Sequence, residues 1–393
     1  MKKQIVFLML TALMMGTIVP SVFADAALTN ERFRATGKYD IVAAGVGLHD
    51  KSDGVITLNI PDPGTSVVVV AYLYWSGYGP MGSGDAVVDF EGSQVTVLDS
   101  FGPDLWFDDD YSYVYVADVT AAVTAADSSY TVEGVDFAVN FGAGLIVVYE
   151  NDALPTAEAI ILDGLDNFWF GWTDPRGPNS GVTSFTFNAA AVSRNAKMTL
   201  LAGGTEHDNR PNEIWIETGV SPAPSPDGNL INPASDPDGD YPLVGADGAS
   251  WDTYVADVTV EVGDEWAAVQ VESVYSYEEP LNSEGYYGRG TSGTLIAAGF
   301  TIPIPCMADG LSPGFWKHNI AVYLGENPGR YSVPHEGEPR ITDEILEAYF
   351  DMIPVTAEDA YAALTAKGKG SGQIRLDMGN LFNAAAGYAP YSD

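Results

Sequence analysis

The six residues Tyr115-Val-Ala-Asp-Val-Thr120 occur a second time in the chain, as Tyr254-Val-Ala-Asp-Val-Thr259. The surroundings of the two copies also match. Similar runs lie at 71–77 and 198–204 before the copies, and at 142–150 and 292–300 after them. Self-similarity of this kind indicates a duplicated structural unit. The sequence therefore predicts one β-unit present twice, followed by a tail of different character.

Both units are rich in short runs of β-branched and aromatic residues, such as Val67–Trp75 and Leu145–Tyr149. Clusters of Gly, Pro, Asp and Ser separate these runs, which is typical of short antiparallel strands. We therefore expect two tandem antiparallel β-sandwich domains of jelly-roll-like type. Because Val67–Trp75 is apolar on both faces, we expect it to be a central strand covered from both sides.

Composition divides the chain further. Residues 1–24 have a basic start, an apolar stretch and a small-residue cleavage site, as secretory signal peptides do. After residue 305 the sequence changes to helical signals, including the capping-box spacing of Thr356-Ala-Glu-Asp359. Asp377 is expected to start a last helix. The expected parts are a signal peptide at 1–24, a first β-sandwich domain at 25–164, a second with two inserted loops at 165–305, and a small α-helical C-terminal module at 306–393.

The charge balance restricts the possible partners. The chain has 17 Lys and Arg against 54 Asp and Glu, a formal net charge of −37. Such a surface repels nucleic acid and favours cations, so no nucleic-acid partner is expected. Beyond the signal peptide no apolar run is long enough to cross a bilayer. Cys306 is the single cysteine and cannot form an internal disulfide. We expect a secreted protein, extracellular or held at the cell surface.

The second unit is longer than the first on both flanks of the hexapeptide. The extra residues fall within 221–248 and 275–290. If the flanking strands are consecutive and antiparallel, both insertions emerge at the same end of the sandwich. Loops at one end of a rigid β-scaffold are common binding sites. This end is the predicted binding surface.

The first insertion carries Asp236, Asp238 and Asp240, three carboxylates at alternating positions of a turn. Calcium takes 6–8 oxygen ligands, and Asp-rich loops with Gly supply them. These residues are the candidate calcium site, although Asp-Gly turns also arise in acidic chains without binding any ion.

The second insertion carries the candidate ligand-binding residues Glu278, Glu279, Tyr286 and Tyr287. The glutamates could complete a calcium site. The tyrosines could stack on sugar rings or anchor a protein partner. They could equally cover the end of the sandwich core.

No catalytic residue is predicted. The repeated Asp118 and Asp257 each end a run of strand character, where Asp readily caps a turn or ties a loop to its own backbone. The four histidines lack metal-ligand spacing, and the motif Gly-x-Ser-x-Gly is absent. We expect no enzyme, and no cofactor except calcium.

Two segments resemble known families. Tyr72-Leu-Tyr-Trp75, the hexapeptide and Leu145-Ile-Val-Val-Tyr-Glu150 resemble an uncharacterised domain of exported archaeal and bacterial proteins. The segment Leu311-Ser-Pro-Gly-Phe-Trp-Lys-His-Asn319 is similar to modules at the ends of many secreted prokaryotic proteins. The resemblance implies a cell-surface or extracellular location and carries no known chemistry. Within that segment we expect Trp316 to be a buried aromatic anchor.

These observations predict a secreted, non-enzymatic structural or adhesive protein of the cell surface, stabilised by calcium and binding a glycan or a surface protein. The alternative is a carbohydrate-active protein, either a glycan-binding module or a glycosidase. A third hypothesis is self-assembly by strand addition at an open sheet edge.

Overall fold

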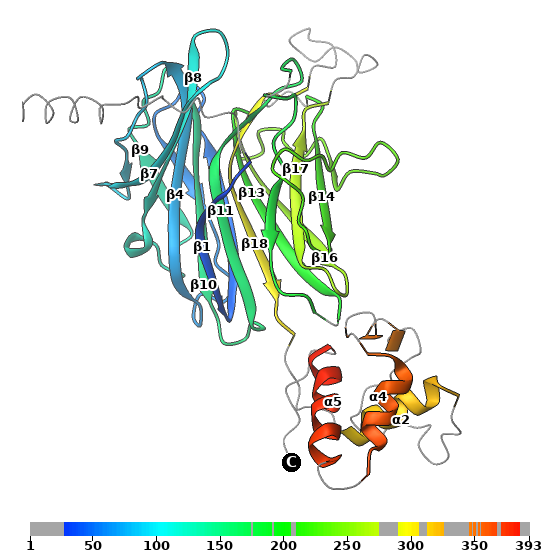
Figure 1. The fold of residues 1–393 in the computed structure, drawn as a ribbon. Helices are drawn as coiled ribbons and strands as arrows, with labels where there is room; N and C mark the ends of the chain where they lie inside the picture. Colours follow the sequence, from blue (N-terminus) through cyan, green and yellow to red (C-terminus); the bar gives the residue numbers. More distant parts are fainter. Residues whose placement is uncertain are drawn as a thin grey trace, which may run out of the picture.

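The protein is mainly β, with antiparallel sheets followed by a helical C-terminal part, in agreement with the sequence (Figure 1). The computed structural model describes residues 27–385, apart from 174–175, 191, 206–209, 275–289, 306–312, 326–345, 348, 351–352, 354 and 368–370. The expected signal peptide and Cys306 lie outside the described residues.

The first half of the chain forms two sheets. The first inner sheet has the order β2 (Tyr39–Gly47), β10 (Val139–Glu150), β4 (Val67–Pro80), β8 (Asp110–Asp118) and β7 (Val97–Leu105). The first outer sheet has the order β3 (Gly54–Thr57), β9 (Ser129–Glu133), β5 (Asp89–Phe90) and β6 (Ser93–Gln94). Every strand pairing in both sheets is antiparallel.

The second half, together with the N-terminal strand β1, forms two more sheets. The second inner sheet has the order β1 (Asn30–Gly37), β11 (Ala157–Phe168), β18 (Gly293–Pro303), β13 (Arg194–Gly203) and β16 (Trp251–Val260). The second outer sheet has the order β12 (Thr183–Thr186), β17 (Trp266–Glu272), β14 (Glu213–Gly219) and β15 (Gly239–Asp240). A single turn of 3-10 helix, Thr120–Ala122, follows β8.

Three hydrophobic cores join these sheets into four layers. Leu73 and Trp75 of β4 belong to a core shared by the first inner and outer sheets. Phe300 of β18 belongs to a core shared by the second inner and outer sheets. Tyr72 and Tyr74 belong to a third core, between the two inner sheets. The expectation that β4 is a covered central strand is therefore confirmed.

The two halves have the same strand order. The series β2-β10-β4-β8 corresponds to β11-β18-β13-β16, and β3-β9-β5-β6 corresponds to β12-β17-β14-β15. They differ at the edges of the inner sheets: β7 lies beside β8 but has no counterpart beside β16, and β1 lies beside β11. The division expected at residue 164 falls within β11, and the N-terminal strand β1 pairs with the second half.

Trp251 fixes the contact between the inner sheets. Its side chain, at the start of β16, is fully buried. It packs against glycines of β2 and β10. A Cβ on Gly45 would lie 2.1 Å from the Trp251 Nε1 atom, and one on Gly144 would lie 2.7 Å from Cζ2. Only glycine leaves room for the indole ring at these positions, so the sheets approach closely here.

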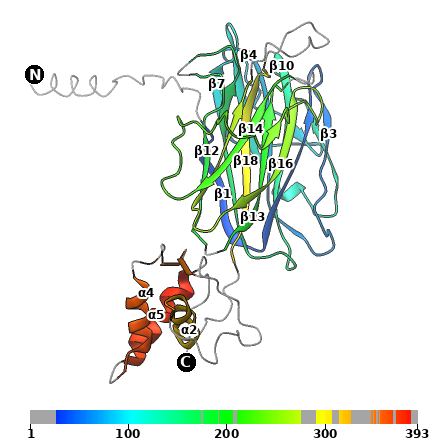
Figure 2. The ribbon, with the colours of Figure 1, turned by 90° about the vertical axis from the view of Figure 1, so that its right-hand side faces the viewer.

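The C-terminal helices are α2 (Pro313–Tyr323), α4 (Ala357–Thr365) and α5 (Ser371–Ala385), which lie apart from the sheets (Figures 1 and 2). They share a core of their own. Trp316 is its fully buried anchor, as expected, and donates its indole N–H to Asn383 Oδ1 at 2.8 Å. Among the described residues, no helix is long and apolar enough to cross a membrane.

Of the two helix starts predicted at Thr356 and Asp377, the first agrees with the structure. Thr356 caps α4 by accepting the backbone N–H of Asp359, which confirms the capping prediction. The start expected at Asp377 is wrong, because α5 begins at Ser371. Asp377 instead lies mid-helix, where its carboxylate accepts a hydrogen bond from the Gln373 side chain at 2.6 Å.

Replacing Gly144 by Ala is expected to reduce the free energy of unfolding by about 1–3 kcal/mol, because the added methyl group overlaps the ring of Trp251. Gly64→Ala is the matched control, since a Cβ there meets no atom within 4 Å. Urea denaturation of both variants measures the difference. Equal stability of the two would contradict the glycine packing described above.

Candidate functional site

The β7–β8 hairpin, at the end of the β body opposite the helices, carries part of an aromatic cluster (Figure 1). The cluster consists of Trp106 and Phe107, from the β7–β8 hairpin, and Trp169, Phe170 and Trp172, from the β11–β12 connection. The ring centroids of Phe107 and Trp169 are 5.0 Å apart, and those of Trp106 and Trp172 are 5.9 Å apart. The cluster therefore joins residues from both halves of the chain.

The rings differ in exposure. Trp106 is 3% exposed and packs against Phe141 at the end of the core between the inner sheets. Phe107, Trp169, Phe170 and Trp172 are partly exposed. The cluster thus has a buried base and a surface that solvent reaches. Large rigid aromatic side chains of this kind are common anchors in binding sites.

A buried polar layer lies beneath the rings. Asn167, fully buried on β11, donates from Nδ2 to Asp104 Oδ2 at 2.7 Å and to Ser112 Oγ at 2.8 Å. Its Oδ1 accepts from Thr294 Oγ1 at 2.6 Å. Asp104 and Ser112 belong to the first inner sheet, whereas Asn167 and Thr294 belong to the second. The layer therefore connects the two halves directly below the aromatic cluster.

Arg176 contacts both the aromatic cluster and the buried polar layer. Its guanidinium lies 3.4 Å from the ring centroid of Trp172, donates to the Trp106 carbonyl at 3.2 Å and lies 3.7 Å from Asp104 Oδ2. Burial raises the pKa of the Asp104 carboxyl above its usual value, while the Asn167 hydrogen bond and the Arg176 charge act against the rise. The arrangement holds the rings in place with hydrogen-bonded polar groups.

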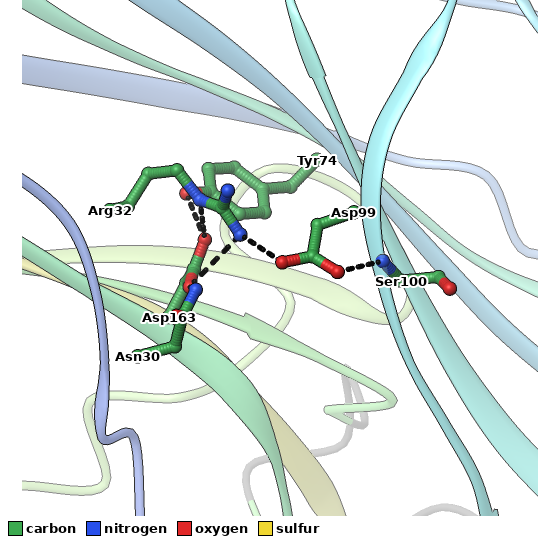
Figure 3. A network of polar contacts seen from close by, with 6 residues as sticks. All are labelled: Asn30, Arg32, Tyr74, Asp99, Ser100 and Asp163. Atoms are coloured by element: carbon green, nitrogen blue, oxygen red, sulfur yellow. Dashed lines mark hydrogen bonds and ion pairs between the residues drawn. The ribbon is translucent and has the colours of Figure 1, made fainter.

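A second polar network crosses the same pair of sheets (Figure 3). The Asp163 carboxylate has no exposed surface and accepts from Arg32 Nε at 2.6 Å, Asn30 Nδ2 at 2.6 Å and the Tyr74 hydroxyl at 2.9 Å. Arg32 also donates to Asp99 Oδ2 at 2.9 Å. The network links β1 and β11 to β4 and β7.

The titration of this network follows from its contacts. Burial acts to lower the pKa of Arg32, but its hydrogen bonds to Asp163 and Asp99 outweigh that effect and raise it. Burial, followed by the Asp163 charge, raises the pKa of Tyr74 well above its usual value. Arg32 therefore stays charged and Tyr74 stays neutral at ordinary pH. Both residues hold the two inner sheets together through their hydrogen bonds to Asp163.

The candidate calcium residues lie in β15 and just before it, opposite the start of β14. Asp236 is exposed. Asp238 donates its backbone N–H to the Ile214 carbonyl at 2.9 Å, and its carboxylate accepts the backbone N–H of Ile216. The side chain of Asp240 lies outside the described residues. Within the part of the chain that the structure describes, no group of three His, Cys, Asp or Glu side chains could hold a metal ion.

Glu278, Glu279, Tyr286 and Tyr287 all lie outside the described residues. The other insertion, at 221–248, leaves β14 at the end where Gly219 pairs with Trp266, opposite to the connection between β17 and β18. It returns through β15, where Asp240 pairs with Glu213, the residue that also pairs with Glu272 at the end of β17. Asp238 and Asp240 therefore lie at the end of the sheet from which the β17–β18 connection leaves. Leu230 then packs with Trp215 and Trp266 on the outward face of the second outer sheet. This insertion covers a sheet before it reaches β16.

The two repeated aspartates have different roles. Asp118 ends β8 and accepts the backbone N–H of Thr120 at 2.9 Å, which confirms the predicted loop tie. For Asp257 that prediction is wrong, because β16 continues to Val260 and Asp257 lies inside the strand, opposite Lys197. The same six residues therefore end one strand and lie inside another.

The aromatic cluster was not predicted from the sequence. A signal for it exists in Phe168-Trp-Phe-Gly-Trp172, which holds four aromatic residues among five. This run lies at the end of β11, and the corresponding part of the first half has no such run. Its partner Trp106-Phe107 lies far away in the sequence, so only the fold brings the two together.

No known family model and no curated protein matches the chain. Among solved structures, the infectious bursal disease virus Gt strain aligns with a TM-score of 0.25 and 10% identity, covering 72% of this chain and 76% of that chain. The Gx strain aligns at 0.22 and 9% identity, covering 70% and 71%. The VP2 subviral particle of the same virus aligns at 0.21 and 10% identity, covering 72% and 76%. Similarity at this level supports no common function.

Asp163→Asn is expected to lower the free energy of unfolding by about 3–5 kcal/mol, because it leaves the Arg32 charge without its buried partner. Asp99→Asn is the control on the same arginine. The Asp99 side chain is 45% exposed, so its loss is expected to cost less than about 1 kcal/mol. Thermal and urea unfolding measure both, and a cost at Asp99 equal to that at Asp163 would contradict this assignment.

Proposed function

We propose that the protein is a secreted, non-enzymatic structural or adhesive protein of the cell surface. In this proposal each half is one β-sandwich of jelly-roll type, and the two are duplicates of one unit. The observation that carries the proposal is the aromatic cluster, built from both halves at one end of the β body. A binding surface made by two units requires that they stay fixed to one another.

The rigidity of the body supports this role. The inner sheets share a buried core, the indole of Trp251 rests on glycines of the other sheet, and the Asp163 network crosses the same junction. The cluster rests on this junction through Asn167 and Arg176. A surface whose side chains are already ordered loses little conformational entropy on binding.

The chemistry of the polar groups favours binding over catalysis. Asp104 and Asp163 both accept hydrogen bonds from neighbouring side chains, and each lies close to an arginine. A general base needs a free path to the proton that it abstracts. Their hydrogen bonds are instead used to hold β1, β7 and β11 in place.

A second candidate function is glycan binding, the non-catalytic form of a carbohydrate-active protein. It is favoured by the partly exposed tryptophans Trp169 and Trp172 beside a carboxylate and a guanidinium. Sugar rings present apolar faces to aromatic rings and hydroxyl groups to charged side chains. The adhesive proposal includes this case, with a surface glycan as the ligand.

A glycan array tests this candidate. We expect binding to at least one glycan class, with Trp169→Ala and Trp172→Ala each weakening it about tenfold or more through the loss of stacking area. Trp169→Tyr keeps an aromatic face and is the matched control, expected to retain most of the affinity. A chromogenic glycoside screen is run in parallel. Turnover of a glycoside would show that the protein is a glycosidase and would contradict the adhesive proposal. Glycan binding that neither alanine variant weakens would show that the aromatic cluster is not the binding site.

Calcium stabilisation is proposed for the segment 236–240, which contains β15. Millimolar calcium is expected to raise the melting temperature, because a bound ion offsets the repulsion among Asp236, Asp238 and Asp240. Asp240→Ala is expected to abolish the shift. Because Asp238 also accepts a backbone N–H, its alanine variant lowers stability with or without calcium and is not the decisive test. An unchanged melting temperature in calcium would refute the proposal.

A further inference from the structure

The two copies of the hexapeptide have different neighbours. In the first copy, β8 lies between β4 and β7, and Tyr115, Val116 and Ala117 pair with β7. In the second copy, β16 pairs with β13 on one side and forms the edge of its sheet. Among the residues that the structure describes, no strand takes the position beside β16 that β7 takes beside β8.

At the open edge of β16, every second residue points its backbone N–H and C=O groups away from β13. Trp251 donates its N–H to the Gly248 carbonyl and accepts the N–H of Asp247, so its backbone groups point away from β13. Groups on a strand alternate in direction. Those of Val255, Asp257 and Thr259 therefore also point outward, and no partner for them lies within the described part of the chain. All three side chains are exposed, Val255 by 52%.

The other edges of the inner sheets are protected. β1 carries charged residues and an irregular register at Glu31 and Phe33. β7 contains Pro103 and two irregularities in its pairing. The outward N–H of Gly47 on β2 already bonds to the Asp247 carbonyl. These are the usual features that keep sheet edges from pairing. β16 pairs with β13 over ten residues without a break and contains no proline.

We propose that two copies of this chain associate through β16, edge to edge and antiparallel, so that their second inner sheets form one continuous sheet. The occupant is inferred from the fold, because an antiparallel strand already fills the equivalent position beside β8. An edge that pairs with its own copy needs only one open strand per chain and closes on a twofold axis. The association does not depend on the aromatic cluster or on any ligand.

The net negative charge of the chain determines how this dimerisation depends on salt. At a net charge of −37, two copies repel one another, and Asp257 adds a charge at the edge itself. Salt screens such repulsion between exposed charges. Dimerisation is therefore expected to strengthen with ionic strength, unlike an association held by opposite charges.

Sedimentation velocity at several salt concentrations tests the proposal on the secreted protein. The expected result is a concentration-dependent dimer that Val255→Pro weakens at least about tenfold. Proline at 255 removes an outward N–H and leaves the pairing with β13 intact. Val255→Thr keeps the N–H and is the matched control. A monomer at every concentration and salt level, or a dimer that Val255→Pro leaves unchanged, would overturn the proposal.

Disulfide trapping gives a second measurement that does not depend on how proline is tolerated. In a Cys306→Ser background, Val255→Cys and Asp257→Cys are oxidised separately and as a mixture. Opposed residues in an antiparallel pair lie about 4.5–5.5 Å apart at Cα, which a disulfide can bridge. At least one combination is expected to give a covalent dimer, and Thr36→Cys on the opposite edge is expected to give none. No cross-link in all three combinations, or equal cross-linking at Thr36, counts against pairing through β16.

Discussion

The two inner sheets pack face to face, and this contact fixes the positions of the polar networks and of the aromatic cluster. Each half could bury one face of its inner sheet against its own outer sheet, but the opposite face is also apolar. Tyr72, Ile146 and Ile296 would be exposed if the halves separated. Burial of apolar surface is the main driving force of folding, so the halves are stable together. The glycines beneath Trp251 show how closely the sheets fit.

The same junction organises the polar groups. A side chain that leaves water must recover its hydrogen bonds, and Asp163 does so with three side-chain donors from β1 and β4. Asn167 repeats the arrangement between Asp104 and Thr294. Both networks use residues from each half, so a shift of one sheet against the other would leave buried groups unpaired. Because the buried polar groups must stay paired, the two sheets cannot shift, and the aromatic cluster that they carry keeps its position.

Strand runs, the covered β4 and the cap at Thr356 could be read from the sequence because each depends on neighbouring residues. The pairing of β1 with β11 could not, since its register is set by contacts between distant segments. The hexapeptide shows the limit clearly. In identical sequence, Asp118 ends a strand, whereas Asp257 lies inside β16, which pairs with β13 as far as Val260. The aromatic cluster likewise needed the fold to bring Trp106 and Trp172 together.

The pairing of β1 with β11 has a consequence for how the molecule is made. β1 is the first strand of the chain, yet its partner comes only at residues 157–168, and that partner's other neighbour, β18, follows at 293–303. Contacts between distant segments form slowly because a long loop must close first. The N-terminal strand therefore stays unpaired until the chain has been synthesised at least as far as β11. The export proposed above would suit this order of events, because a chain that crosses a membrane unfolded brings all of its strands together before folding is complete.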